Sequence, residues 1–158
     1  MKREPRVCIV ILNWNGIEDT VECIDSLFRM DYHNFDLIIV DNGSTDDSIT
    51  VISRTFQEAA DRNDPERRFD FVSMRADQGG KPIWPSGGPS GPTDEEANYL
   101  ILVSSDRNLG FSTGVNVGLE IGLDRLSPDF FLLLNNDLVV DSRLIPDLLD
   151  MAMKEERA

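Results

Sequence analysis

The hydrophobic positions of this chain fall into two kinds of pattern that follow each other along the sequence. Short continuous apolar runs rich in β-branched residues are typical of strands buried on both faces. Apolar residues that recur every three or four positions are typical of amphipathic helices. The runs that predict strands are residues 7–12, 36–40, 69–74, 99–104 and 129–134. The helical series begin near Ile17, Ser44, Gly110 and Asp141.

The order of these elements predicts the fold class. Strands that alternate with helices indicate an α/β fold, in which a mostly parallel sheet carries helices on both faces and is Rossmann-like. Residues 69–74 and 99–104 follow each other without a helix, so we expect these two strands to form a β-hairpin insertion. The 158 residues are predicted to form a single domain, 1–158.

The segment 78–97 has a different composition from the rest of the chain. It holds five glycines and four prolines in twenty residues, and Trp84 is its one large side chain. Such a Gly/Pro-rich stretch predicts a long loop. The sequence leaves two roles open for this loop, a flap over an active site or a decoration without a part in the chemistry.

Glycines recur every four residues in the third helical series, at Gly110, Gly114, Gly118 and Gly122. Each glycine inside a helix costs roughly 1 kcal/mol relative to alanine. We therefore expect a close neighbour on this face of the helix, either the sheet or a ligand.

Charge and composition exclude several classes of function. The chain has 29 acidic and 15 basic residues, a net charge of -14, which disfavours binding to nucleic acids and to anionic membranes. No apolar run approaches the roughly 20 residues of a membrane-spanning helix, and the N-terminus lacks a signal-peptide pattern, so we expect a cytoplasmic protein. The chain has only two cysteines, Cys8 and Cys23, which are too few for a disulfide framework. It has a single histidine, so a catalytic or metal site built on several histidines is not expected. Both cysteines are expected to be free, buried thiols.

Polar residues cluster directly after three of the predicted strands. The clusters are residues 13–16, 41–47 and 135–137. In parallel α/β sheets ligands bind beyond the carboxyl ends of the strands, so these clusters are expected to meet in one site. Ser44 and Asp47 also have the spacing of a capping box at the start of a helix.

Two of these clusters could carry chemistry. Asn135, Asn136 and Asp137 offer oxygen ligands that could hold Mg²⁺ or Mn²⁺ together with a ligand diphosphate, although an Asn/Asp turn has the same composition. Asp41 could accept hydrogen bonds from a ribose hydroxyl or a base N–H, and a helix-capping role is equally compatible with its position. No GxGxxG or GxxxxGK[ST] motif is present, which argues against NAD as cofactor and against a P-loop.

Five short motifs in sequence order together resemble the family 2 glycosyltransferases of the GT-A fold, and most closely their rhamnosyltransferase-like branch. Each motif is weak alone, but five with sensible spacing are specific. The resemblance covers residues 7–150. The motifs are residues 10–16 (VILNWNG), 40–46 (VDNGSTD), 108–111 (NLGF), 114–118 (GVNVG) and 133–137 (LLNND).

The resemblance implies a site for a nucleoside diphosphate sugar. Asp137 is implied as the main ligand of a divalent metal, with Asn135 where the family's DxD motif has its first acid. Asp41 is implied to contact the nucleoside, and Asn116 to face the site from the glycine-spaced helix. The implied nucleotide-binding residues are Leu12, Asn13, Trp14, Asp41, Asn108, Gly110, Asn116 and Asn136.

The implied reaction is inverting transfer of a sugar from the nucleotide donor to an acceptor hydroxyl on a glycan or a lipid-linked molecule. In the family, the general base follows the segment that matches Met151. We therefore expect the base to lie beyond residue 158, and this chain to be the donor-binding N-terminal half, inactive by itself. The full-length protein could then lie at the cytoplasmic face of a membrane. An uncovered sheet edge would favour a homodimer.

One alternative function stays open at this stage. A non-catalytic nucleotide-binding or interaction module of the same fold would carry the same motifs. A response-regulator-like receiver domain is less consistent with the sequence, because no lysine follows a late strand at the required place.

Overall fold

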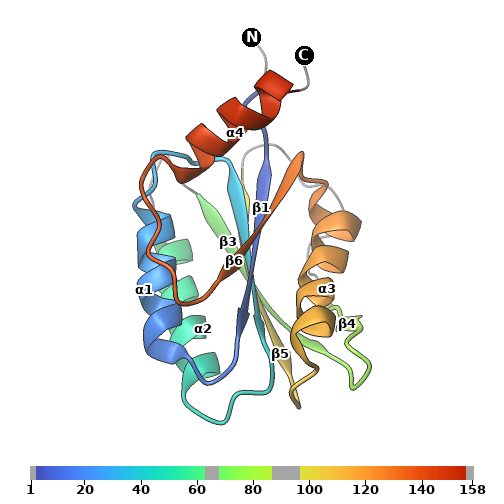
Figure 1. Ribbon diagram of the computed structural model, residues 1–158. Helices are drawn as coiled ribbons and strands as arrows, with labels where there is room; N and C mark the ends of the chain where they lie inside the picture. The colour runs from blue at the N-terminus through green and yellow to red at the C-terminus, as the bar shows by residue number, and fades with distance from the viewer. Residues whose placement is uncertain (1–2, 63–67, 87–96, 156–158) are drawn as a thin grey trace.

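The computed structural model describes residues 3–62, 68–86 and 97–155, and it confirms the predicted α/β fold with a mostly parallel sheet (Figure 1). The six-stranded sheet has the order β4-β3-β5-β2-β1-β6. Its strands are β1 Val7–Asn13, β2 Phe35–Asp41, β3 Phe69–Ala76, β4 Pro82–Ile83, β5 Asn98–Ser105 and β6 Phe130–Asn135. The helices are α1 Ile17–Phe28, α2 Ser48–Asp61, α3 Phe111–Ile121 and α4 Leu144–Glu155, with a π-helical turn η1 at Gly122–Leu126.

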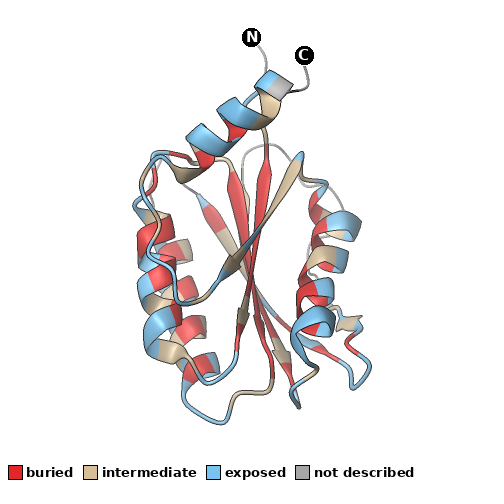
Figure 2. Ribbon diagram, viewed as in Figure 1, coloured by how far each residue is buried: buried red, intermediate tan, exposed pale blue. Residues whose placement is uncertain are grey.

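Alternate residues of the central strands face two separate apolar layers. In β1, Ile9 and Ile11 pack in the layer under α1, α2 and α4, whereas Cys8 and Val10 pack in the layer under α3. Figure 2 shows the buried residues concentrated in the central strands and on the sheet-facing sides of the helices. Burial on both faces explains why these strands read as continuous apolar runs instead of alternating ones.

The glycines of α3 and η1 allow the helix to approach the sheet closely. A Cβ at Gly114 would lie 2.4 Å from Leu12 Cδ1, one at Gly118 would lie 2.4 Å from Val10 Cγ1, and one at Gly122 would lie 2.5 Å from Phe131 Cε1. The close neighbour expected from the spacing is therefore the sheet at these three positions. Gly110 differs, because it precedes the helix with φ +82° and a Cβ there would meet open space.

The expected hairpin between residues 69–74 and 99–104 is wrong, because β3 and β5 pair in parallel over their whole length, from Phe69↔Asn98 to Ala76↔Ser105. β5 lies inside the sheet and runs parallel to β2 on its other side. The connection 77–97 is long enough to return the chain to the amino edge of the sheet. β3 instead forms a short antiparallel pair with β4.

The turn between β3 and β4 is held by Asp77, whose carboxylate accepts the N–H groups of Gly79 and Lys81 at 2.8 Å each. These hydrogen bonds hold the pKa of Asp77 below its usual value. The expected long loop thus begins with a structured turn and the strand β4. Residues 87–96 of that loop lie outside the described residues.

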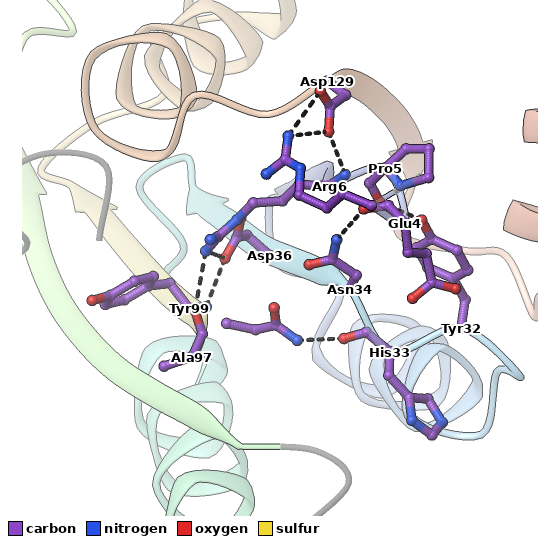
Figure 3. Close-up of polar contacts among 12 residues, drawn as sticks. Glu4, Pro5, Arg6, Tyr32, His33, Asn34, Asp36, Ala97, Tyr99 and Asp129 are labelled. Atoms are coloured by element: carbon purple, nitrogen blue, oxygen red, sulfur yellow. Dashed lines mark hydrogen bonds and ion pairs between the residues drawn. The ribbon is translucent and has the colours of Figure 1, made fainter. Parts of the chain in front are cut away.

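A group of charged residues connects neighbouring strands at the amino edge of the sheet (Figure 3). Arg6, which directly precedes β1, forms a bidentate ion pair with Asp36 of β2. Asp36 also accepts the N–H of Tyr99 in β5 at 2.7 Å. The backbone N–H of Arg6 donates to Asp129, just before β6. The helix α4 and the start of the chain lie at this same end of the sheet (Figure 1).

The two cysteines are free and buried, as predicted. Burial raises the pKa of the Cys23 thiol to about 11 and also raises the pKa of Cys8. Within the described ranges, none of the helices has the length and apolar character that crossing a membrane would require.

Candidate functional site

The carboxyl ends of β5, β2, β1 and β6 lie side by side, because these strands are parallel neighbours in the sheet. Asn13 is paired in register with Asp41, and Leu12 with Asn135. The polar clusters at 13–16, 41–47 and 135–137 therefore meet at one edge, opposite the edge that carries α4 (Figure 1).

Asp41 lies at the centre of this edge and is completely buried. One carboxylate oxygen accepts Asn13 Nδ2 at 2.7 Å, and the other accepts the N–H of Ser44 at 3.0 Å. Asn13 is also completely buried. The sequence predicted a direct nucleoside contact for Asp41, whereas the structure places its carboxylate beneath the surface, where it holds the loop that follows β2.

A residue that the sequence analysis missed, Thr20, joins this pair to the loop after β6. The buried hydroxyl of Thr20 donates to Asn13 Oδ1 at 2.7 Å and accepts Asn136 Nδ2 at 3.0 Å. Gly16 leaves room for this contact, since a Cβ there would lie 2.5 Å from Asn136 Nδ2. A hydrogen-bonded chain thus runs from Asn136 through Thr20 and Asn13 to Asp41.

The loops after β1 and β2 are joined by a second residue that the sequence did not single out, Asn15. It has a left-handed backbone conformation, with φ +53°, and its Oδ1 accepts the N–H of Thr45 at 2.7 Å. Its own N–H donates to the Ser44 hydroxyl at 2.9 Å. Asparagine tolerates this conformation better than most residues, which explains why it is found at this turn.

The predicted capping box at Ser44 and Asp47 is wrong. α2 begins at Ser48, and Asp47, which precedes it, makes no side-chain capping hydrogen bond. The Ser44 hydroxyl is used between the two loops, and Asp46 takes the capping role by accepting the N–H and the hydroxyl of Ser48. These hydrogen bonds hold the pKa of Asp46 below its usual value.

On the other side of Asp41, Asn42 connects the loop to the segment after β5. Its Oδ1 accepts the N–H of Leu109 at 2.8 Å, and its Nδ2 donates to Asn108 Oδ1 at 3.0 Å. Gly43, with φ +76°, lies so close to the Arg107 backbone that a Cβ would be 2.4 Å from Arg107 C. The predicted residues Asn108 and Gly110 are therefore brought next to the Asp41 loop.

The other predicted nucleotide-binding residues lie around the rim of this edge. Trp14 is 58% exposed, and Leu12 is half-buried under Gly114. Asn116 is exposed and lies two residues from both Gly114 and Gly118, so it is on the side of α3 turned away from the sheet. This position does not agree with the expectation that Asn116 faces the site.

The residues predicted to bind a metal lie at the end of β6, with Asn135 as its last residue and Asp137 just after it. Asn135 and Asp137 are exposed, and Asn136 is half-buried. Across the described ranges, no group of three or more His, Cys, Asp or Glu side chains could enclose a metal ion. One carboxylate with neighbouring amide oxygens fits Mg²⁺ or Mn²⁺ that takes its remaining ligands from water and substrate phosphates, which is the usual way Mg²⁺ is held.

An open, mostly parallel sheet with polar loops gathered at its carboxyl edge is typical of Rossmann-like α/β folds, in which ligands bind at that edge. Residues 8–72 match the sequence model of the family described as Glycosyl transferase family 2. The matched region runs from β1 into β3, and the described part of the chain has the Rossmann-like fold of the GT-A type. No curated protein matches the sequence significantly.

Solved structures of two proteins share this fold at low sequence identity. TarS from S. aureus, in a complex with UDP, aligns with a TM-score of 0.60 at 14% identity over 94% of this chain and 32% of its own. A further TarS structure, with UDP-GlcNAc, aligns with a TM-score of 0.59 at 16% identity, over 94% of this chain and 31% of its own. The mannosyltransferase PcManGT from Pyrobaculum calidifontis, in complex with GDP-Man and Mn²⁺, aligns with a TM-score of 0.61 at 15% identity, over 93% of this chain and 32% of its own. This chain therefore spans about a third of the length of these structures.

Proposed function

We propose that this chain is the donor-binding part of an inverting glycosyltransferase and binds a nucleoside diphosphate sugar at the carboxyl edge of the sheet. The observation that carries the proposal is the hydrogen-bonded chain Asn136–Thr20–Asn13–Asp41. It joins the segment with the metal-binding residues to the segment with the nucleotide-binding residues. The nucleotide ligands in the TarS and mannosyltransferase complexes support the same ligand class.

In this proposal each loop has a separate role. Asp41 and Asn13 hold the loops after β1 and β2 in shape, and the exposed residues Trp14, Asn108 and Gly110 contact the nucleotide. Asp137, with Asn135, binds the divalent metal. When bound, the metal neutralises negative charge on the diphosphate leaving group.

The acceptor is proposed to be a glycan or a lipid-linked hydroxyl, and the general base to come from outside residues 1–158. The chain alone is then expected to bind the donor without transferring the sugar. A cytoplasmic location and a place in the rhamnosyltransferase-like branch belong to the same proposal. The net charge of -14 supports a small-molecule ligand over a nucleic acid.

Calorimetric titration with UDP, dTDP and GDP, each with and without Mn²⁺, tests the proposal. At least one nucleotide is expected to bind more tightly with Mn²⁺, and Asp137→Ala should reduce that binding at least tenfold. Asp150→Ala is the matched control, because Asp150 is an exposed aspartate of α4 at the opposite edge of the sheet. If none of the three nucleotides shows metal-dependent binding, the proposed site is wrong.

A further inference from the structure

The hydroxyl of Thr20 occupies an unusual position for a residue in the first turn of a helix. Its backbone N–H donates to Gly16 O in the ordinary helical way, at 2.9 Å. The side chain is completely buried and bridges the last residue of β1, Asn13, and the first residue after β6, Asn136. Thr20 is therefore the side chain through which the loop after β1 and the loop after β6 are linked.

The direction of each hydrogen bond in this link is fixed by Asp41. Both carboxylate oxygens of Asp41 accept N–H groups, one from Ser44 and one from Asn13 Nδ2, so Asn13 turns its Oδ1 toward Thr20. Thr20 then has to donate to Asn13, and its lone pair receives Asn136 Nδ2. The amide of Asn136 is thereby oriented with Nδ2 toward Thr20, which leaves its Oδ1 for other partners next to Asp137.

We propose that Thr20 is a positioning residue that couples metal binding at residues 135–137 to nucleotide binding at the loops that Asn13 and Asp41 hold in shape. The inference rests on the proposed function, because it assumes that both ligands bind at this edge. A shift of either loop changes the geometry of the other through two hydrogen bonds and one buried hydroxyl. Coupling of this kind is reciprocal, so metal should strengthen nucleotide binding by the same factor as nucleotide strengthens metal binding.

Two substitutions separate the hydroxyl from the shape of the side chain. Thr20→Val keeps the branched shape but leaves Asn13 Oδ1 and Asn136 Nδ2 without their partner. Thr20→Ser keeps the hydroxyl. Thr55→Val is the matched control, because the Thr55 hydroxyl bonds Val51 O inside α2 and touches neither loop.

The coupling is measured as the ratio of the nucleotide Kd without Mn²⁺ to that with Mn²⁺, using GDP and UDP on this chain. Thr20→Val is expected to reduce the ratio at least fivefold, while its metal-free Kd changes less than twofold. Thr20→Ser and Thr55→Val should keep the ratio within twofold of the unmodified protein. An unchanged ratio in Thr20→Val overturns the inference, and so does an equal loss of affinity with and without Mn²⁺, which would mark a merely structural role.

A second measurement needs no variant and so covers the case in which Thr20→Val does not fold. The side-chain amide NMR signals of Asn13 and Asn136 are compared in GDP alone and in GDP with Mg²⁺. Both signals are expected to shift together when Mg²⁺ is added, and a shift of Asn136 without Asn13 overturns the inference. Failure of the proposed function has a different signature, since the unmodified protein would then show no metal-dependent binding of UDP, dTDP or GDP.

Discussion

Arg6 and Asp36 form a bidentate ion pair, with two hydrogen bonds of 2.7 Å, at the amino edge of the sheet (Figure 3). The exposed fraction of the Arg6 side chain is 8% and that of Asp36 is 0%. The hydrogen bond to Asp36 raises the pKa of Arg6 above its usual value. Because Tyr99 also donates to Asp36, the pair joins β1, β2 and β5 at the edge opposite the candidate site.

Breaking this ion pair is expected to destabilise the fold strongly. Arg6→Ala leaves the Asp36 carboxylate buried without its partner, which typically costs about 3–5 kcal/mol of the free energy of unfolding. Urea denaturation measures the loss. Arg3→Ala removes the exposed pair with Asp129 and should cost less than about 1 kcal/mol. Equal losses in the two variants would contradict the assignment of Arg6 as the stabilising partner.

The cap of α2 by Asp46 is expected to depend on pH. The ionised carboxylate accepts two hydrogen bonds from Ser48, so its pKa is lower in the folded than in the unfolded protein. Its stabilisation is therefore present above the unfolded value of about pH 4 and is lost as the pH falls through the lower folded value. Asp46→Ala should cost about 1 kcal/mol at pH 7 by urea denaturation, with the difference shrinking in acid. Asp47→Ala is the control, because it removes no capping hydrogen bond, and it should change the free energy of unfolding by less than about 0.5 kcal/mol. If Asp47→Ala destabilised the protein more than Asp46→Ala, the assignment of Asp46 as the cap would be wrong.

Alanine at Gly118 is expected to destabilise the protein although alanine favours helices. The added Cβ would lie 2.4 Å from Val10 Cγ1, and such overpacking typically costs about 1–3 kcal/mol. Val10→Ala removes the atoms that clash. The destabilisation of the double variant should therefore be smaller than the sum of the two single destabilisations by at least about 0.5 kcal/mol, measured by thermal or urea unfolding. Additive effects would mean that α3 can move away from β1 without cost.

The outer edge of β6 is expected to promote self-association. β6 pairs with β1 alone in the described part of the chain, and Leu133 is 49% exposed. Open strand edges with apolar side chains favour edge-to-edge pairing, and a lysine on the edge opposes it. Light scattering should therefore detect a dimer that Leu133→Lys weakens. Leu123→Lys is the control, since Leu123 is 66% exposed but lies in η1, and a monomer at high concentration would rule out this contact.

Hydrophobic patterning was sufficient to predict the main strands and helices, but not every pairing between strands. A continuous apolar run such as 99–104 indicates that a strand is covered on both faces, but it does not determine which strands lie beside it in the sheet. The short sequence distance to β3 suggested a hairpin, whereas the complete burial of residues 99–103 is what a strand inside a parallel sheet requires. The glycine spacing, by contrast, predicted a close approach that the contacts at Leu12 and Val10 confirm.

At the candidate site, motif position predicted that Asn13, Asp41 and Asn136 lie together, but not how they are connected. Thr20 was missed because a single threonine in a helix has no motif of its own. The available signal was its spacing, since Thr20 lies four residues before Ile24 and seven before Leu27, both completely buried. A polar residue on the apolar face of a helix needs a hydrogen-bond partner, and here the partners belong to the loops.

The placement of α4 and of the segment that leads into β1 has a practical consequence for experiments on the isolated protein. The segment leading into β1 and the helix α4 both lie at the amino edge, and the candidate site is at the other edge (Figure 1). Attaching the protein to a sensor chip or a bead through either end therefore leaves Trp14 and Asp137 facing the bulk solution. Surface-based titrations of small nucleotides can then use a tag at the start or at the end of the chain without obstructing their access.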